Sequence, residues 1–365
     1  MKIRKAAAYL TAALFCTAAA VNATDDIFMD DDINVGGPNI YGDMAAEVLI
    51  APRSAALSAS DLALNAAGPV ASNPALAARS AAPELTLSYS SYYGDVFSAS
   101  IINYTNKIGS SGGISATVAY LLIPGIEDTR GVDIRAVDSN DVKLFLDPND
   151  ITTFAASDIW GRVSYGHSFE TKHANVYAGA AVTARRRNLD KKTSAYGLGA
   201  DLGVMAYFPK PSVYAALLWE NVRHSVVKWQ SDDYSEKVPQ HLRMSLAYER
   251  EDPYIYGRIA LFYTSPDLFF NEGINAYGEA ADREEDRSPE ARTLSDGAGI
   301  LFSAGRYGIE YTIMNTLSLR AGVNGTGYSM GAGLSLFGGR AGVDFCYLNH
   351  ELAGTVKMSV TYRWL

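Results

Sequence analysis

Few residues in this chain have the types and spacings that catalysis or metal binding requires. The histidines show no metal-ligand spacing; they are His167, His173, His224, His241 and His350. No Gly-x-Ser-x-Gly elbow, phosphate-binding loop or paired-cysteine motif occurs in the sequence. We therefore predict that the protein is not an enzyme, and that it has no catalytic residue, no metal site and no cofactor.

Two acidic stretches, at residues 138–141 and 147–150, could offer oxygen ligands to calcium. Both lack the glycine and the terminal glutamate of a formal calcium-binding loop. Asp, Asn and Ser are also ordinary turn residues, because their side chains bond to the nearby backbone. Turn formation is the favoured interpretation of both stretches, and calcium binding is the alternative.

A third group of candidates consists of charged residues that alternate with apolar neighbours. We predict that they face the inside of a barrel: Arg162, Asp201, Arg243, Arg258, Glu310, Arg320, Asp344, Lys357 and Arg363. Glu310 and Arg320 lie on adjacent predicted strands, as do Asp344 and Arg363. Two interpretations remain open: a network of salt bridges in a narrow or plugged lumen, or a solute pathway of alternating charge.

The elements that position these residues are β-strands. From Glu84 to the end, segments of about 9–12 residues alternate apolar with small or polar side chains, the pattern of strands that cross a bilayer at a tilt. The last segment is the clearest, because its apolar face ends in Tyr362 and Trp364, which we predict to act as a C-terminal barrel-assembly signal. We predict about fourteen strands: 84–92, 95–106, 113–123, 158–167, 175–186, 194–208, 212–223, 241–250, 254–264, 305–313, 316–323, 327–337, 340–348 and 355–364. Residues 297–303 are assigned to a loop.

The lengths of the connections alternate along the chain. Every second connection is short, whereas three of the others are long, at residues 124–157, 224–240 and 265–304. Short periplasmic turns and long external loops are typical of outer-membrane barrels. The predicted fold is therefore all-β: a transmembrane outer-membrane barrel of about fourteen antiparallel strands with a short N-terminal helical plug.

The composition agrees with this fold. Of 365 residues 48% are hydrophobic, yet no apolar run of about 18 residues follows the first two dozen positions, which excludes a helical membrane protein. The 23 tyrosines suit membrane interfaces, and we expect Tyr207 and Tyr248 among them to lie there. The net charge of −9 argues against nucleic-acid binding. The basic stretch 185–187 flanks an external hairpin and favours a solvated or lipopolysaccharide-facing loop.

The N-terminal part divides into three segments before the barrel at residues 83–365. Residues 1–23 are predicted to be a cleaved signal peptide, with a basic start and an apolar stretch too short to span a bilayer. Residues 24–50 form an acidic tail that we expect to be flexible. Residues 51–82 are rich in alanine and are predicted to form helical turns of a plug. Cleavage would leave Cys346 as the sole cysteine, so no intramolecular disulfide could form.

The plug segment carries the most specific resemblance to a known family. It contains Pro52-Arg53-Ser54-Ala55-Ala56 and Ser72-Asn73-Pro74-Ala75-Leu76-Ala77, which resemble the plug signature of FadL-type barrels, and of the PorV/PorQ branch in particular. Later motifs resemble the same branch: Ala200-Asp201-Leu202-Gly203, Gly308-Ile309-Glu310-Tyr311, Leu319-Arg320-Ala321-Gly322 and Val343-Asp344-Phe345-Cys346-Tyr347. The chain departs from the branch at Leu57-Ser58, where a Met-Gly pair is usual, and in its long loop 265–304.

The resemblance implies a fourteen-stranded outer-membrane barrel with its N-terminal segment in the lumen. By resemblance to PorV, we expect a non-enzymatic protein that assists protein secretion or surface attachment, as in type IX secretion, through secretion components or exported cargo. The alternative, by resemblance to FadL, is transport of hydrophobic or small solutes. Other expected partners are outer-membrane lipid, lipopolysaccharide and the barrel-assembly machinery.

Overall fold

We analysed a computed structural model of the chain. It describes residues 48–64, 72–128, 135–136, 144–145, 151–190, 193–223, 225–230, 235–238, 240–252, 256–269, 301–325, 327–350 and 353–364. The predicted signal peptide and nearly all of the acidic tail lie outside these residues, as do both candidate calcium stretches. None of the described helices has the length and apolar composition needed to span a bilayer.

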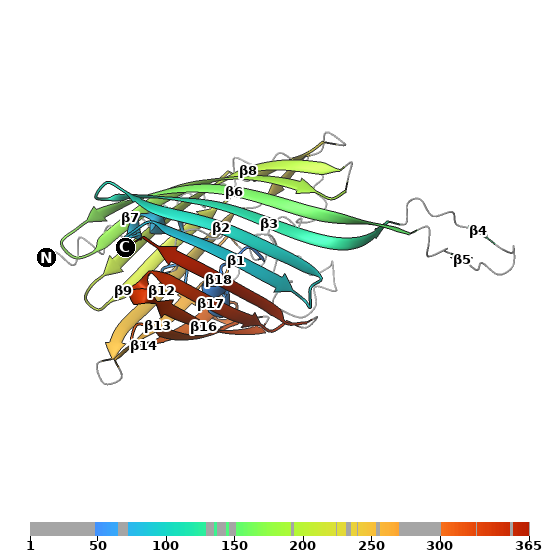
Figure 1. Cartoon of the computed structure of the whole chain (residues 1–365). Coiled ribbons are helices and arrows are strands. Elements are labelled where there is room, and N and C mark those ends of the chain that lie inside the picture. The colour runs from blue at the N-terminus through green and yellow to red at the C-terminus, as the bar shows by residue number, and fades with distance from the viewer. Residues whose placement is uncertain are drawn as a thin grey trace, which may run out of the picture.

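Fourteen antiparallel strands form a closed barrel, which confirms the predicted fold class. Each strand pairs with its neighbour in the chain, and β1 pairs with β18 to complete the ring (Figure 1). The strands are β1 (Glu84–Tyr92), β2 (Phe97–Ile108), β3 (Gly112–Asp128), β6 (Thr152–Glu170), β7 (Asn175–Asn188), β8 (Ser194–Phe208), β9 (Val213–Glu220), β12 (His241–Asp252), β13 (Gly257–Thr264), β14 (Arg306–Ile313), β15 (Leu317–Asn324), β16 (Gly327–Leu336), β17 (Ala341–Leu348) and β18 (Thr355–Arg363).

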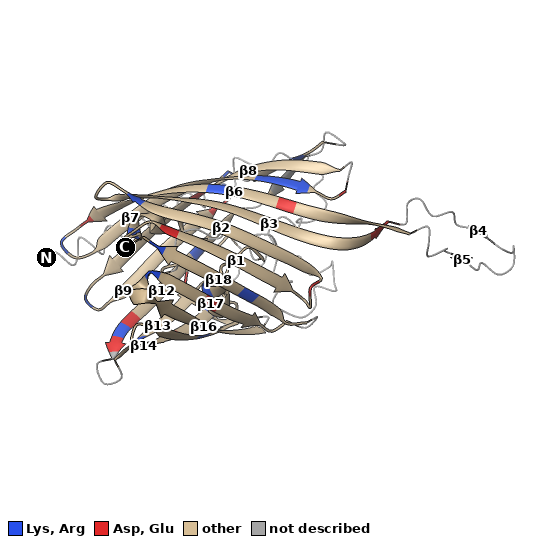
Figure 2. Ribbon diagram, viewed as in Figure 1, with Lys and Arg blue, Asp and Glu red and all other residues tan. Residues whose placement is uncertain are grey.

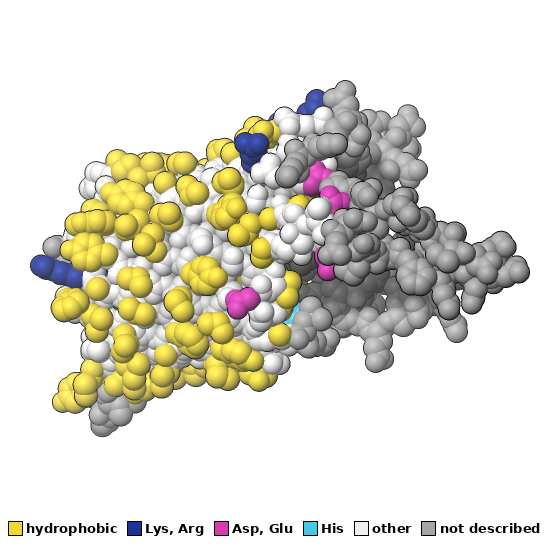
Figure 3. All heavy atoms as spheres, turned by 45° about the vertical axis from the view of Figure 1, so that its right-hand side comes forward, with side chains coloured by type: hydrophobic (Ala, Val, Ile, Leu, Met, Phe, Trp, Pro, Cys, Tyr) yellow, Lys and Arg dark blue, Asp and Glu magenta, His cyan; other side chains and the backbone are white. Residues whose placement is uncertain are grey.

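The two faces of the wall differ as the alternation predicts. In β18, Lys357 and Ser359 are buried, whereas Val360 and Tyr362 are about half exposed. Exposed apolar side chains cover much of the outer surface (Figure 3). A soluble protein does not expose an apolar surface of this extent, but a lipid-facing wall requires one. The architecture is that of an outer-membrane barrel.

Several boundaries differ from the predicted ones. Strands β3 and β6 extend beyond the predicted ends to Asp128 and back to Thr152, because they keep pairing past a bulge between Ile123 and Ile126. The predicted strand 212–223 ends at Glu220, and its course along β8 is resumed by β10 (Ser225–Trp229), which forms a hairpin with β11 (Ser235–Val238). This hairpin lies in a predicted loop.

Tyr207 faces the lumen and stacks on Tyr214 at 4.4 Å between ring centroids, so its predicted interface position is wrong.

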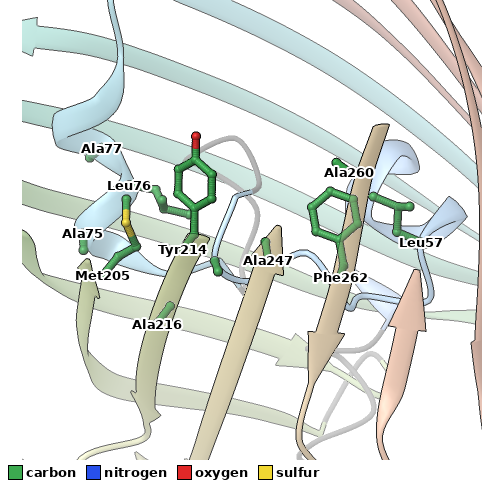
Figure 4. Close-up of a cluster of buried hydrophobic side chains, with 11 residues drawn as sticks. Leu57, Ala75, Leu76, Ala77, Met205, Tyr214, Ala216, Ala247, Ala260 and Phe262 are labelled. Carbon is green, nitrogen blue, oxygen red and sulfur yellow. The ribbon is translucent and has the colours of Figure 1, made fainter. Parts of the chain in front are cut away.

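Two short helical segments of the plug lie inside the barrel. They are α3 (Pro52–Ala56) and η1 (Pro74–Arg79), and nearly all of their residues are buried. Figure 4 shows Leu57 and Leu76 of the plug facing small and aromatic side chains of the wall, including Tyr214 and Phe262. The plug and the inner wall therefore share one hydrophobic core.

Candidate functional site

A row of four glycines in the wall forms the seat of η1. Gly113, Gly166, Gly179 and Gly203 are direct register partners on the neighbouring strands β3, β6, β7 and β8. A Cβ on any of them would lie within 3.0 Å of plug atoms; on Gly113, for example, it would lie 2.0 Å from the Ala77 carbonyl oxygen. These glycines let the plug backbone approach the wall backbone, which no other residue type would permit here.

A second glycine group receives the end of α3. Gly308 and Gly322 are register partners on β14 and β15, and a Cβ on Gly322 would lie 2.4 Å from the Leu57 carbonyl carbon. Next to it, Ser58 adopts a left-handed backbone conformation with a φ of 51°. Its N–H donates to Ser329 Oγ at 3.1 Å. Glycine adopts this conformation without strain, and the bond to the wall helps to offset the strain of a left-handed serine.

Asn73 connects the Asn-Pro-Ala element to the wall. Its Oδ1 accepts a hydrogen bond from the Ala75 N–H at 3.0 Å, which caps η1, and Pro74 occupies the first turn, where its missing N–H is tolerated. Its Nδ2 donates to the carbonyl oxygens of Val204 and Leu217 at 3.2 and 3.3 Å. Asn73 is fully buried, so water cannot reach its side-chain amide, and these bonds supply the hydrogen-bond partners that the amide needs.

Arg53 joins α3 to a buried ion network in the wall. Its guanidinium donates to both Glu310 oxygens at 3.0 and 3.1 Å and to Asp61 Oδ2 at 3.2 Å. Arg320 donates to Glu310 at 2.6 Å and to Asp344 at 2.6 Å. Four predicted site residues, Arg53, Glu310, Arg320 and Asp344, therefore meet in one place.

The pKa values of the two plug residues in this network, Asp61 and Arg53, are shifted from their ordinary values. Burial raises the pKa of the Asp61 carboxyl, and the opposing effects of Arg53 and Ser54 are smaller. Burial by itself would lower the pKa of the Arg53 guanidinium, but the carboxylates of Glu310 and Asp61 raise it above its ordinary value. Arg53 is therefore a permanent cation in this network.

Gly333 makes the link between Arg320 and Asp344 possible. These two residues lie on β15 and β17, on either side of β16, and Gly333 on β16 is the register partner of Asp344. A Cβ at this glycine would lie 2.4 Å from Asp344 Oδ1 and 2.7 Å from Arg320 Nη1. The ion pair thus crosses β16 at Gly333, the position where this strand has no side chain in the way.

Asp201 and Arg363 belong to separate pairs. Asp201 accepts from Arg162 at 2.9 Å and from the Asn221 N–H at 3.0 Å, where the wall passes from β9 to β10. Arg162 also donates to the Ser72 carbonyl oxygen of the plug at 3.0 Å. Arg363 pairs with Glu84 across the β1–β18 closure, whereas Asp344, on the adjacent strand β17 but opposite Ser359, pairs with Arg320.

Lys357 fastens the chain at the start of the plug. Its ammonium donates to the carbonyl oxygens of Val48 and Ile50 at 3.0 and 3.2 Å and to the Tyr92 hydroxyl at 2.5 Å. It also lies 4.8 Å from the centroid of the Tyr92 ring, within the range of a cation–π interaction. The inward position of Lys357 follows from the alternation, but its partners at residues 48–50 could not be identified from the sequence.

A cavity of about 480 Å³ lies between the plug and the wall, at the end of the barrel where the short turns lie. Its lining includes five arginines and three carboxylates: Arg53, Arg79, Arg258, Arg320, Arg363, Glu84, Glu310 and Asp344. Charged residues also occur on strands away from this lining, and the Arg162–Asp201 and Arg187–Asp158 pairs are among them (Figure 2). Among the described residues, no group of three or more His, Cys, Asp or Glu is arranged to hold a metal.

Tyr362 and Trp364 lie on the outer face, each about half exposed, with their rings in an edge-to-face contact at 5.1 Å. They flank Arg363 in the chain but lie on the opposite face of the wall from the luminal cavity that Arg363 lines. Their position is compatible with the predicted role as an assembly signal, which stays a prediction.

The glycine seats are the functional feature that sequence reasoning missed. The glycines occupy inward positions of their strands, but that signal has meaning only when the register places them side by side. A glycine at an inward position of several consecutive strands could have indicated a surface that another backbone approaches.

No protein-family model matches the sequence, and no curated protein matches it. Among solved structures, the CymD monoaromatic hydrocarbon channel is similar over 87% of this chain and 98% of its own, with 11% identity and a TM-score of 0.44. A Pseudomonas aeruginosa FadL homologue is similar over 91% and 99%, with 10% identity and a TM-score of 0.41. The Pseudomonas putida toluene transporter TodX covers 80% and 90%, with 10% identity and a TM-score of 0.41. These similarities concern the barrel fold, and the narrower PorV/PorQ resemblance stays a prediction from sequence motifs.

Proposed function

We propose that the barrel is an outer-membrane channel for small polar solutes and that the N-terminal plug controls the path through its lumen. The observation that carries this proposal is the luminal cavity between plug and wall. Its volume of about 480 Å³ lies within the range of pockets that hold small molecules. The solute class follows from the groups that line it.

The lining combines guanidinium groups, carboxylates and hydroxyls, with Thr312 and Ser318 among the last, and it also includes apolar side chains such as Leu76 and Leu334. A hydrocarbon in this cavity would displace water from these groups without replacing its hydrogen bonds, which is unfavourable. A solute with both donors and acceptors, such as a zwitterion or a sugar, can replace the lost water. Of the hydrophobic and small solutes that the FadL resemblance allows, the cavity favours the small polar ones.

The described contacts between plug and wall are ion pairs, hydrogen bonds and packing. Arg53 contributes two of these hydrogen bonds, because it binds both oxygens of Glu310 from the plug side. A solute that passes the plug has to displace contacts of this kind. Weakening them should therefore raise the solute flux while the barrel itself stays closed.

Swelling of proteoliposomes tests the proposal. With the wild-type barrel, swelling in a zwitterionic amino acid or a small neutral sugar should exceed that of empty liposomes. The Arg53→Ala variant should swell faster, and Arg340→Ala, which truncates an exposed arginine in the turn before β17, should not. The proposal is contradicted if the wild-type barrel swells no faster than empty liposomes. If it then takes up a labelled hydrocarbon selectively, the transported solutes are hydrophobic and not polar.

A second candidate function, assistance to protein secretion through periplasmic partners, is favoured by a different observation. Three neighbouring turns at the short-turn end each expose a large apolar side chain: Tyr256, Met314 and Phe337, which are 78%, 68% and 80% exposed. Apolar side chains exposed at neighbouring turn tips suit a protein partner. Affinity capture from gently solubilised membranes should then yield secretion components or exported cargo with the wild type, and lose them when all three residues are replaced by serine. Equal recovery with both forms would contradict this role.

A further inference from the structure

The other end of the barrel carries a row of outward-facing residues that the channel proposal does not use. Arg186 on β7 is the register partner of Tyr196 on β8, and Tyr196 is in turn the partner of Lys228 on β10. All three side chains are exposed on the outer surface. In this row one cation lies on each side of the tyrosine, and the three residues belong to three neighbouring strands.

Strand alternation separates Arg186 from its two arginine neighbours. Arg185 points inward, where its guanidinium lies 5.2 Å from the centroid of the Trp160 ring. Arg187 also points inward and binds Asp158 at 2.8 Å. Arg186 alone of the three faces outward, and within the described part of the chain no carboxylate pairs with it. The basic stretch 185–187 is thus divided between two faces of the wall.

The row lies at a boundary between apolar and polar surface. One register step toward the middle of the barrel, the outward residues include Leu198 and Val226, which are 67% and 47% exposed. One step toward the rim they are polar: Asn188 donates to Ser157 Oγ at 3.4 Å, and Ser194 donates to Gln230 at 2.6 Å. Figure 3 shows dark blue side chains at the edge of the apolar belt. This is the depth at which lipid headgroups meet the wall.

The loops identify the leaflet. The row lies at the end opposite to the short turns, where the connections of the β3–β6, β9–β12 and β13–β14 pairs are long. Long connections mark the external end of an outer-membrane barrel. The apolar surface below the row therefore faces the acyl chains of the outer leaflet.

We infer that Arg186, Tyr196 and Lys228 form a binding site for the phosphate of a phosphorylated outer-leaflet glycolipid, as in lipopolysaccharide. The Arg186 guanidinium lies 5.4 Å from the centroid of the Tyr196 ring, and this contact favours an orientation in which its planar donors meet a phosphate bidentately. Strands two apart are separated by about 10 Å, so the long Arg and Lys side chains can reach a phosphate between them. The acyl chains of the same lipid pack on Leu198 and Val226.

This inference is independent of the solute that passes through the lumen, because none of its residues lines the cavity. Native mass spectrometry of the full-length barrel in detergent tests it, with bisphosphorylated lipid A as the probe and the same lipid A without phosphates as the comparison. The wild type should bind the phosphorylated form at least about tenfold more tightly, as expected for one or more charge-assisted hydrogen bonds. The double variant Arg186→Gln/Lys228→Gln should lose this preference.

A matched control separates the site from a general effect of surface charge. Arg250 is also exposed and outward, but it lies near the short-turn end of β12. Arg250→Gln should retain the preference for phosphorylated lipid A, and all variants should keep the difference in gel mobility between heated and unheated samples that marks a closed barrel. The inference is wrong if the double variant keeps the preference, if Arg250→Gln loses it equally, or if millimolar inorganic phosphate displaces the lipid.

Discussion

Replacement of Gly179 by alanine should release the plug from its seat without opening the barrel. A Cβ at this position would lie 2.5 Å from the Ala75 nitrogen and the Pro74 carbonyl carbon. Both are backbone atoms, so no side-chain rotation relieves the contact. Since ordinary contacts begin near 3.4 Å, η1 must move away from β7 by about 1 Å.

The expected cost combines two effects. Overpacking of a tight interface costs about 1–3 kcal/mol. A shift of this size also lengthens the bonds from Asn73 to the carbonyl oxygens of Val204 and Leu217, which are already 3.2 and 3.3 Å long, at about 1 kcal/mol each. We therefore expect the seated plug to lose about 3–5 kcal/mol, which raises the population of the released state by roughly 150-fold or more.

Hydrogen exchange of residues 72–82 in the detergent-solubilised barrel measures this population directly. Gly161→Ala is the matched control, because nothing lies within 4 Å of a Cβ at Gly161, and an alanine in a strand is by itself mildly favourable. Exchange of the plug should rise in Gly179→Ala only, while exchange of the wall strands and the heat-dependent gel mobility stay unchanged. Equal plug protection in wild type, Gly179→Ala and Gly161→Ala would refute the seat.

Three other perturbations test the ion network and the N-terminal anchor. Glu310→Gln leaves Arg53 and Arg320 without their shared carboxylate and should cost about 3–5 kcal/mol in urea unfolding, whereas Glu251→Gln at an exposed position should stay within about 0.5 kcal/mol. Lys357→Met should expose residues 48–50 to protease, since their carbonyl oxygens lose a donor; unchanged cleavage would exclude Lys357 as the anchor. The pKa of Asp61 is raised in the folded plug, so its ionised form costs stability, and this cost grows as the pH rises through the interval above its ordinary value of 3.8. The protection factors of the plug amides, which are exchange rates corrected for the intrinsic effect of pH, should therefore depend less on pH in Asp61→Asn. An identical pH profile of the protection factors would show that Asp61 is not the titrating group.

The sequence predicted the closed barrel and the facing of its charged residues, and the resemblance to FadL-type barrels implied a plug in the lumen. The first two features follow from local patterns: a period of two gives the strand and its faces, and alternating connection lengths give the up-and-down order. The inward facing of Glu310, Arg320 and Asp344 follows from this alternation, and the place of Arg53 in the plug follows from its motif.

Only the tertiary structure decided which of these residues meet. Arg320 reaches Asp344 across β16 because Gly333 leaves the space, so the pairing of Asp344 could not be read from strand adjacency. Tyr207 looked like an interface residue, yet its inward register makes it part of the core with Tyr214. The glycine row under η1 and the outward row at Arg186 exist because closure and register align positions from separate strands. Alternation is a property of each strand alone, whereas register is set by all the pairings around the ring.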